Sequence, residues 1–465
     1  MRTARLPWRT KAGFGAAELG FTALEVLVQV YLLKFYNDVV GLPPAWTGAA
    51  LAAGILWDAV TDPLMGGISD RTRSARGRRR VYFLPGTLVL AVLVVLLFNP
   101  PELESHPLQF AWLLLTFMAL NTASTVVAVP YVALAGELTF DRDERTSVFG
   151  YRRLAGVLGL VVGTVLPAVF LAALGGDGDP ANEARSRGLT GVSLAPVLLL
   201  GTWVTLRATR GLDRPAEGGG EARRPLLPLL WELFRAQRHA WRNPVFLPLL
   251  AAFVIAAVGR TLNGSIALYY YEYRLELAEE VVVPVVLLPF FLCLLVAIPA
   301  WVAVSRRFGK RGPAFLGALG LGVLTAVAYP LLPPGGLAGP VLVALLGGAC
   351  AGSIAILDSL IADVVDHDEL HSGEHREGLY FGVWKLGTKL ARAAGLLVAG
   401  LLLDAIGFVE GTGRQDPEVA WRLALIFGPV VGGFFTAGAL VFLLFPLDDE
   451  RHRRVQRLLL RRRRR

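Results

Sequence analysis

The chain has 465 residues and a net charge of +9; 54% of its residues are hydrophobic and only 18% are charged. A soluble chain would carry about a quarter of charged residues, and a disordered chain would be less hydrophobic, so this composition excludes both. It has only two cysteines, Cys293 and Cys350, which excludes a disulfide scaffold, and we expect both to lie buried in apolar helices.

Twelve apolar stretches are long enough to cross a bilayer as a helix, which takes about 20 residues. The alternation of apolar and polar residues that is typical of membrane strands does not occur. We therefore predict an all-α membrane protein with twelve transmembrane helices. The stretches cover residues 12–35, 44–68, 81–99, 108–135, 149–174, 189–208, 244–271, 280–304, 313–333, 338–362, 378–405 and 419–446.

Lysine and arginine predict the topology. With the amino terminus in the cytoplasm, the cytoplasmic segments hold 34 of the 46 basic residues and the outer loops hold 5, among them Arg185 and Arg187. Because positive residues stay on the cytoplasmic side, we expect both termini to be cytoplasmic in a bacterial-type inner (plasma) membrane. The net charge thus reflects topology and predicts no nucleic-acid partner. The basic residues 461–465 are expected to contact acidic membrane lipids.

The polar segment 207–242 separates six apolar stretches from six. Its second part, 226–241, indicates a helix on the inner membrane surface, and a flexible linker is the alternative. The sequence FGYRRL at 149–154 parallels FGVWKL at 381–386. Two similar six-helix bundles are typical of a transporter that rocks around a central solute. We predict bundles at 1–208 and 244–446, a linker at 209–243 and a basic tail at 447–465.

Charged residues inside apolar stretches are costly and mark functional sites. Asp58 and Asp62 are four residues apart, so both carboxylates lie on one helix face. Thr61 lies between them, and we expect Pro63 to break the helix beside them. Two close carboxylates in a low dielectric favour a shared cation or proton, and hard cations prefer oxygen ligands. Salt bridges from both aspartates to arginines elsewhere are the alternative.

The eleventh stretch carries Lys385, Lys389 and Arg392 on one basic face. We expect this face to meet Asp58 and Asp62 across a central cavity. The alternative is that Lys385 extends to the inner membrane surface.

Two further pairs of charged residues lie within the first and fifth apolar stretches. Of Arg152 and Arg153, we expect one to face the cavity. Glu18 and Glu25 are seven residues apart and share a helix stripe. They either contact the solute or pair with Arg260 of the seventh stretch.

The segment 363–377 is predicted to be a cytoplasmic loop that carries acids and three histidines, His367, His371 and His375, at every fourth residue. Zinc binding is conceivable for such a set, but Gly373 interrupts any helix there. We therefore favour a loop of gate salt bridges and no metal beyond a coupling cation. The other histidines, His106, His239 and His452, are expected at the surface.

The chain has no phosphate-binding loop with a Lys-Ser/Thr pair and no nucleophile with a matching base. We therefore expect neither ATP drive nor enzyme activity, and no cofactor.

Five motifs together resemble the glycoside–pentoside–hexuronide:cation symporters, the melibiose-permease branch of the major facilitator superfamily. The resemblance covers nearly the whole chain and implies a two-bundle symporter that works by alternating access. We expect it to act as a monomer on a small solute. The motifs are GFGA at 13–16, YNDVVGL at 36–42, WDAVTDP at 57–63, PYVAL at 130–134 and ADVVD at 362–366.

For the cation, the resemblance implies a site at Asp58 and Asp62, which match the two essential carboxylates of the family. Thr125 matches its hydroxyl ligand and Lys389 its lysine in the eleventh helix. Thr61 replaces an asparagine of the sodium-using sugar members, which leaves the choice between sodium and protons open.

For the solute, the resemblance is weaker. Arg152 matches the family's arginine in the fifth helix, but the two expected aspartates are Gly20 and Ala128, and the expected tryptophan is Val132. Glu18 lies about 200° around the helix from Gly20, which would point it away from that position.

A sugar or glycoside is therefore the first interpretation of the solute. The sequence DAVTD at 58–62 also reads like that of the vertebrate sodium-dependent lysophosphatidylcholine symporters. A lysophospholipid or other amphipathic anion is the alternative, and a non-transporting membrane sensor is a remote one. Asp70, Arg71, Asp363 and Asp366 are predicted to form the inner gate.

Overall fold

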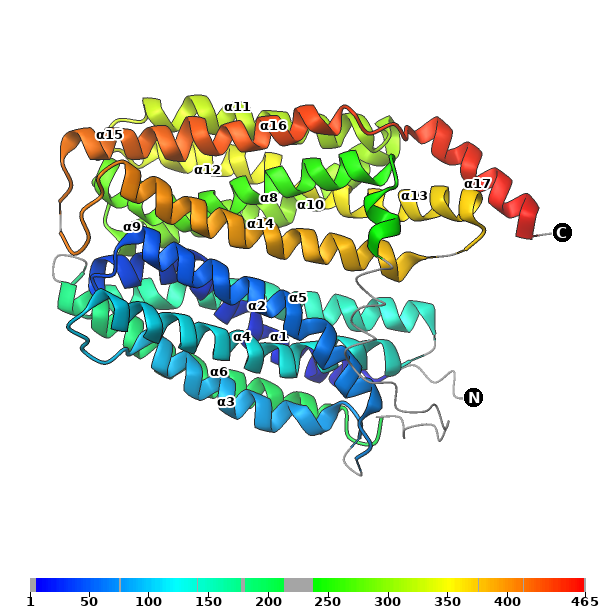
Figure 1. Ribbon diagram of the computed structural model, residues 1–465, viewed down its shortest axis with the longest axis horizontal. Helices are drawn as coiled ribbons and strands as arrows, with labels where there is room; N and C mark the ends of the chain where they lie inside the picture. Colours follow the sequence, from blue (N-terminus) through cyan, green and yellow to red (C-terminus); the bar gives the residue numbers. More distant parts are fainter. Residues whose placement is uncertain are drawn as a thin grey trace. The chain divides into compact units, whose positions relative to one another are not determined.

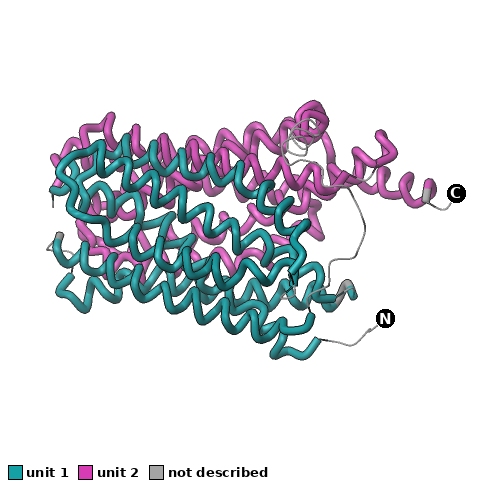
Figure 2. The backbone as a smooth tube through the Cα atoms, turned by 60° about the horizontal axis from the view of Figure 1, so that its bottom comes forward, with its two compact units in different colours: residues 1–230, 409–413 teal, residues 231–408, 414–465 magenta. Residues whose placement is uncertain are grey.

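The structure is a computed structural model that describes residues 6–74, 77–139, 141–176, 180–212, 237–374, 376–412 and 414–463. Its contacts divide the chain into two compact units (Figure 2). Unit 1 comprises residues 1–230 and 409–413, and unit 2 comprises residues 231–408 and 414–465. All regular elements within the described residues are helical, as the sequence predicts.

Unit 1 contains six long helices (Figure 1). The first ends in a π-helical turn, η1, and the third is preceded by a short 3₁₀ turn, η2. In chain order the elements are α1 (Trp8–Lys34), η1 (Phe35–Val39), α2 (Pro44–Arg71), η2 (Arg80–Tyr82), α3 (Phe83–Phe98), α4 (His106–Glu137), α5 (Arg142–Ala173) and α6 (Pro180–Ala208).

Unit 2 repeats this order. The first of its six membrane-length helices ends in a π-helical turn, two others are interrupted by such turns, and α12–α13 is interrupted by a short turn. A further helix, α17, follows them. The elements are α8 (Phe246–Tyr269), η3 (Tyr270–Arg274), α9 (Glu279–Val282), η4 (Val283–Leu287), α10 (Leu288–Phe308), α11 (Arg311–Leu331), α12 (Ala338–Ala351), α13 (Ile354–Ser372), α14 (Glu377–Ala405), α15 (Pro417–Leu425), η5 (Ile426–Val430), α16 (Val431–Phe442) and α17 (Asp449–Arg463).

The two units pack their helices in the same order. In unit 1, α1 packs on α5 and α6, α2 on α4, and α3 on α4 and α6. In unit 2, α8 packs on α14 and α16, α10 on α12, and α11 on α12 and α16. Each unit is therefore a version of one six-helix bundle, which confirms the predicted architecture.

The repeat extends to the backbone geometry where the first helix of each unit ends. In unit 1 the amide of Leu42 donates to the carbonyl of Tyr36 at 2.9 Å, and in unit 2 that of Leu277 donates to Tyr271 at 3.0 Å. The residue before each donor has a positive φ, +78° at Gly41 and +55° at Glu276. These matched turns fix the register in which the two halves align.

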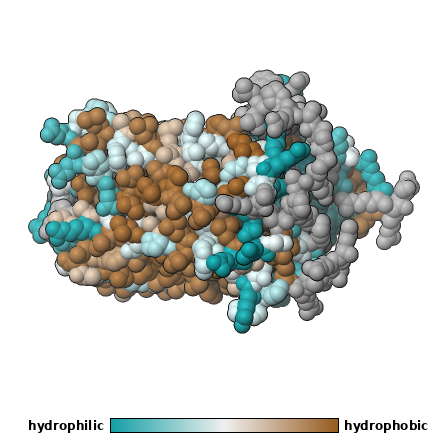
Figure 3. All heavy atoms as spheres, turned by 90° about the horizontal axis from the view of Figure 1, so that it is seen from below, coloured by the Kyte–Doolittle hydropathy of each residue, from teal (hydrophilic) through white to brown (hydrophobic). Residues whose placement is uncertain are grey.

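Eleven helices of the described chain are long and apolar enough to cross a membrane, judged by length and composition. The helix α2 is not among them, because Asp58, Asp62 and several glycines lower its hydropathy. Apolar side chains gather over the middle of the face drawn in Figure 3, and polar residues gather at its two ends. This pattern fits a bilayer around the middle of the helices.

Three details of the predicted elements are wrong. The helix α2 continues through Pro63 to Arg71, because a proline removes one backbone hydrogen bond without ending a well-packed helix. The segment 363–372 is the last part of α13 and not a loop, and the helix ends where Gly373 adopts φ +79°. The helix α6 begins at Pro180, so Arg185 and Arg187 are helical and not in an outer loop.

The predicted linker and interfacial helix fall largely outside the described residues. Leu230 and Phe234, two apolar residues of the predicted interfacial helix, lie outside the described residues. Residues 237–241 are helical, and the side chain of Trp241 is exposed. The linker boundaries therefore remain a prediction.

Close approach of α1 and α5 holds the core of unit 1 together, and glycines on α5 allow it. A Cβ atom at Gly159 would lie 2.2 Å from the carbonyl oxygen of Leu19, and one at Gly163 would lie 2.4 Å from that of Ala23. Both obstacles are backbone atoms of α1, which cannot move aside as a side chain can. The helix pair therefore depends on these glycines.

We predict that Gly159→Val destabilises the protein by about 3 kcal/mol, because the new side chain forces α5 away from α1. The matched control is Gly150→Val, also on α5, where a Cβ atom would meet nothing within 4 Å. Thermal unfolding of the purified proteins should give a midpoint several degrees lower for the Gly159 variant only. Equal midpoints for the two variants would contradict this account of the packing.

Candidate functional site

The two aspartates of α2 converge on one hydroxyl group of α4. The Thr125 Oγ1 atom lies 2.6 Å from Asp58 Oδ1 and 3.0 Å from Asp62 Oδ1. Thr125 is buried, while the two aspartates are half-buried. A hydroxyl has a single hydrogen, so it donates to only one of the carboxylates at a time. The other carboxylate oxygen then faces the hydroxyl oxygen without a hydrogen between them.

This cluster has the chemistry of a small cation site. Two carboxylate oxygens of α2 lie within hydrogen-bonding distance of one hydroxyl oxygen of α4. Two carboxylates so close in a low dielectric repel unless a proton or a cation is shared between them. Oxygen ligands of this kind suit a hard cation or a proton.

Thr61, the other predicted ligand, uses its hydroxyl differently. Its Oγ1 atom donates to the backbone carbonyl of Asp58 at 3.3 Å. A threonine inside a helix commonly forms such a bond with the preceding turn. The third oxygen next to the carboxylates therefore comes from Thr125.

A second polar contact joins α2 to α4 beside the cluster. The indole Nε1 of Trp57 donates to Thr122 Oγ1 at 2.9 Å, and this hydroxyl donates to the carbonyl of Met118 at 2.8 Å. The tryptophan side chain is otherwise largely exposed. Because Trp57 directly precedes Asp58, the contact fixes α2 against α4 at the level of the carboxylates.

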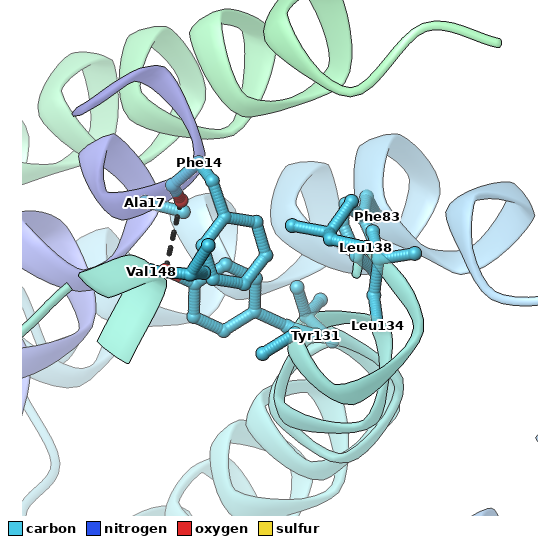
Figure 4. Packing of buried hydrophobic residues seen from close by; sticks show 9 residues of the cluster. Phe14, Ala17, Phe83, Tyr131, Leu134, Leu138 and Val148 are labelled. Carbon is cyan, nitrogen blue, oxygen red and sulfur yellow. Dashed lines mark hydrogen bonds between the residues drawn. The ribbon is translucent and has the colours of Figure 1, made fainter. Parts of the chain in front are cut away.

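The second polar group of unit 1 is an ion pair between α1 and α5. Arg152 donates from Nε to Glu18 Oε2 at 2.7 Å and from Nη2 to Oε1 at 2.9 Å. Its guanidinium lies 5.3 Å from the ring centre of Tyr131. Tyr131 stacks on Phe14 and donates to its carbonyl oxygen at 2.9 Å (Figure 4). A buried hydrophobic cluster thus holds the aromatic side of this site.

The partner of Glu18 differs from the predicted one, since it is Arg152 and not Arg260. Gly20 faces α6, where a Cβ atom would lie 2.9 Å from Leu198. Glu18 and Gly20 therefore face different helices, as their spacing predicts. Glu18 faces α5, which carries Arg152, and Gly20 faces α6. Glu25 is exposed within its unit and, like Arg260, has interactions of its own.

The corresponding place in unit 2 holds two aromatic rings. The register of the repeat aligns Glu18 with Phe253, and the paired FG motifs align Arg152 with Trp384. Phe253 and Trp384 stack with their ring centres 3.9 Å apart, and both are buried. The contact between the first and fifth helices of a unit is therefore ionic in unit 1 and aromatic in unit 2.

The basic face of α14 is present, and it belongs to unit 2. Lys385 is exposed, whereas Lys389 and Arg392 are half-buried. Asp58 and Asp62 belong to unit 1, so the predicted pairing of lysine and carboxylates remains a prediction.

Ion pairs gather at the end of unit 1 where α2 and α4 terminate. Arg79 contacts Asp70 at 3.0 Å and Glu137 at 2.6 Å, and Arg78 contacts Glu137 at 2.5 Å. Arg71 is exposed at the last turn of α2. These bonds join the chain that follows α2 to the end of α4.

Unit 2 has a similar contact, which reaches the middle of α13. Lys310, in the turn after α10, contacts both oxygens of Asp363 at 2.7 and 2.8 Å. His452 of α17 lies 3.5 Å from Asp363 and 3.7 Å from Asp366. The expected surface position of His452 is thus wrong, because its side chain is largely buried against these aspartates. Of the predicted gate residues, Asp70, Asp363 and Asp366 therefore contact basic side chains of their own unit.

A buried ionic network at the other end of unit 1 was not predicted. Lys34 contacts Asp38 at 3.0 Å and Glu183 at 3.1 Å, and Glu183 contacts Arg187 at 3.2 Å. Arg187 is fully buried, with its guanidinium 4.6 Å from the ring centre of Tyr31. Two positive and two negative groups balance, which explains how an arginine expected in an outer loop is stable inside the bundle.

The histidines of α13 lie close together. The rings of His367 and His371 are 4.3 Å apart, and His239 contacts Asp368 at 3.2 Å. Across the described residues, no group of three His, Cys, Asp or Glu side chains is arranged to hold a metal ion. His375, the third histidine of the predicted set, lies outside the described residues.

Two six-helix units with matched packing and with charged groups inside apolar helices define a membrane transporter of the major facilitator fold. A family model described as MFS/sugar transport protein matches residues 13–449. The chain belongs to this family.

Relatives of this chain include transporters for two kinds of solute. The isoprimeverose transporter of Lactiplantibacillus pentosus is 24% identical, over 94% of this chain and 88% of that protein. The sodium-dependent lysophosphatidylcholine symporter 1 of Gallus gallus is 26% identical, over 94% of this chain and 85% of that protein. Among solved structures, a bacterial homolog to the human lysosomal transporter Spinster, inward-facing and unoccupied, matches with a TM-score of 0.66 and 14% identity over 99% of both chains, which shows a shared fold.

Proposed function

We propose that the protein is a cation-coupled symporter that carries a neutral sugar or glycoside across the cell's inner (plasma) membrane by alternating access. The observation that carries the proposal is the convergence of Asp58 and Asp62 on the single hydroxyl of Thr125. Membership of a transporter family supports the transport function. The excess of basic residues in one set of loops supports cytoplasmic termini.

The cation step follows from the charge of the cluster. The carboxylates of Asp58 and Asp62 both contact the Thr125 hydroxyl, and two negative charges this close repel in a low dielectric. A sodium ion or a proton between Asp58 and Asp62 removes this repulsion, and the Thr125 oxygen supplies a neutral ligand. Binding of the cation by these oxygens would then be the first step of the transport cycle.

Coupling to the solute is assigned to the basic face of α14. Lys389 is the proposed counter-ion of the two carboxylates, and Lys385, one turn earlier, extends that face. A cation that binds Asp58 and Asp62 replaces the positive charge of Lys389, which weakens the lysine's attraction to α2. The lysine becomes available to the solute, so solute binding follows cation binding.

The class of solute is inferred from the pair of Glu18 and Arg152. The bidentate contact neutralises the arginine, so the pair carries no net charge. It still offers guanidinium N–H donors and carboxylate lone pairs side by side. Neighbouring sugar hydroxyls, which both donate and accept, match this arrangement. A phosphate, which only accepts, would face the carboxylate of Glu18.

A lysophospholipid is the second candidate. The DAVTD sequence at 58–62 and the lysophosphatidylcholine symporter among the relatives favour it. This solute would need a cationic partner for its phosphate, and Arg152 is occupied by Glu18. We therefore place it behind the neutral sugar, and the substitution of Glu18 described below separates the two.

The gate is assigned to the ion pairs at the predicted cytoplasmic end. In unit 1, Arg79 pairs with Asp70 of α2 and Glu137 of α4, and in unit 2, Lys310 pairs with Asp363 of α13. Arg71 and Asp366 extend the two sets. Rocking of the units would require these pairs to rearrange.

We predict that Thr125→Val lowers the cation affinity about tenfold or more, because the carboxylates lose a hydrogen-bond donor and the cation loses a ligand. The measurement is the thermal midpoint of the purified protein as sodium replaces choline, and as the pH is lowered. Wild type should be stabilised by one of the two cations, and the variant should lose that response.

The matched control is Thr122→Val on the same helix. It removes a hydroxyl that contacts Trp57 and not a carboxylate. Its cation response should stay close to that of wild type. A Thr125 variant with a full response, or a Thr122 variant with the same loss, would overturn the assignment of this site.

We predict that Glu18→Gln reverses the solute preference. The substitution keeps the shape of the side chain but gives Arg152 a net positive charge. In a thermal-shift screen, isoprimeverose and other neutral glycosides should stabilise wild type, and their apparent affinity should fall about tenfold in the variant. The apparent affinity for lysophosphatidylcholine should rise by a similar factor.

The control for this screen is Glu25→Gln, which removes the same charge from the same helix. The solute preference of the Glu25 variant should match that of wild type. If wild type responds to lysophosphatidylcholine and to no glycoside, the sugar proposal fails and the second candidate replaces it.

A further inference from the structure

A pocket of about 240 Å³ lies within unit 2 beneath α17. Its walls come from the start of α8, the end of α13 and the chain that leads into α17. Most of the lining is apolar, and it includes Val245, Leu370, Leu447 and Val455. Leu458 completes the wall on α17 and is itself partly exposed.

Two arginines of α17, together with His367 of α13, form the polar side of the pocket. Arg451 and Arg454 share one helix face with Val455 and Leu458. Arg451 donates from Nη1 to the carbonyl of Pro446 at 2.9 Å, and its Nε lies 3.7 Å from an oxygen of Asp448.

The neighbouring arginine differs from Arg451. Arg454 makes neither an ion pair nor a side-chain hydrogen bond in the part of the chain that the structure describes. Its charge is therefore not offset there, whereas Asp448 partly offsets that of Arg451. The pocket consequently combines an apolar wall with one uncompensated guanidinium.

The pocket lies where the apolar surface of unit 2 ends. Leu443 and Leu444, directly after α16, are 45% and 69% exposed, and Leu247 in the first turn of α8 is 44% exposed. Pro446 and Val245, which line the pocket, follow and precede these residues by two positions. Exposed leucines of this kind are expected to face hydrocarbon, so the arginines lie at the level of lipid headgroups.

We propose that this pocket binds the headgroup of an anionic phospholipid of the inner leaflet, with its phosphate at Arg454. Basic pockets at the cytoplasmic ends of membrane helices suit such headgroups. The volume is below that of most pockets for drug-sized ligands, about 300 to 1,000 Å³. It fits a headgroup and not a whole lipid, and the acyl chains would lie along Leu443, Leu444 and Leu247.

The lipid would stabilise the docking of α17 on the gate elements of unit 2. On its inner side α17 presents His452 to Asp363 and Asp366. At its start, Asp449 accepts a hydrogen bond from the backbone amide of Lys310 at 3.1 Å. A headgroup that bridges α17 and α13 therefore adds to these contacts. This inference does not depend on the cation or solute sites proposed above.

The test uses the full-length protein purified in a neutral detergent. Thermal midpoints are measured with increasing phosphatidylglycerol, with phosphatidylcholine and with inorganic phosphate. We expect phosphatidylglycerol alone to raise the midpoint of wild type. In Arg454→Gln the concentration needed for half of that rise should increase about tenfold, as expected for the loss of a charge-assisted contact.

The matched control is Arg453→Gln, which removes the same charge from an adjacent exposed position that does not line the pocket. It should respond like wild type. Leu458→Asn, which leaves both arginines, should also weaken the response because it makes the wall polar. Equal effects of the Arg453 and Arg454 variants, an equal response to phosphatidylcholine, or a full response to inorganic phosphate would overturn the proposal.

Discussion

The hydroxyl of Thr125 contacts a carboxylate oxygen of both Asp58 and Asp62, and it can donate to only one of them at a time. The two aspartates lie in the middle of α2, where two negative charges close together are costly in a low dielectric. The helix α4 supplies the hydroxyl and fixes α2 through the contact between Thr122 and Trp57. A proton or a cation shared by Asp58 and Asp62 would remove the repulsion between them, and a requirement of this kind can couple an ion gradient to a conformational cycle.

The two units have the same packing but different chemistry. In both units the first helix ends in a π-helical turn that is followed by a residue with a positive φ, and an ion pair joins the turn after the second helix to the fourth helix. Between the first and fifth helices they diverge, with Glu18 and Arg152 in unit 1 against Phe253 and Trp384 in unit 2. Between these two helices unit 1 therefore presents charged and hydrogen-bonding groups, whereas unit 2 presents aromatic ones.

Hydropathy, basic residues and spacing were enough to predict the helices, the two halves and the shared face of Asp58 and Asp62, because each depends on residues close in sequence. The errors involve partners that are distant in sequence. The sequence predicts a loop position for Arg187, because the charge balance with Glu183 and Lys34 forms only when α6 packs against α1. It predicts a surface position for His452, because the contacts with Asp363 and Asp366 form only when α17 folds back on α13.

The central claim is that the carboxylates of α2 couple a cation gradient to solute movement. Its most direct test is uptake of radiolabelled isoprimeverose into proteoliposomes, driven by an inward sodium gradient and, separately, by an inward proton gradient. Wild type should accumulate the sugar with one of these gradients, and Asp62→Asn, folded to the same thermal midpoint range, should lose accumulation while it still binds the sugar. Gradient-driven accumulation by Asp62→Asn at the wild-type rate would contradict the account.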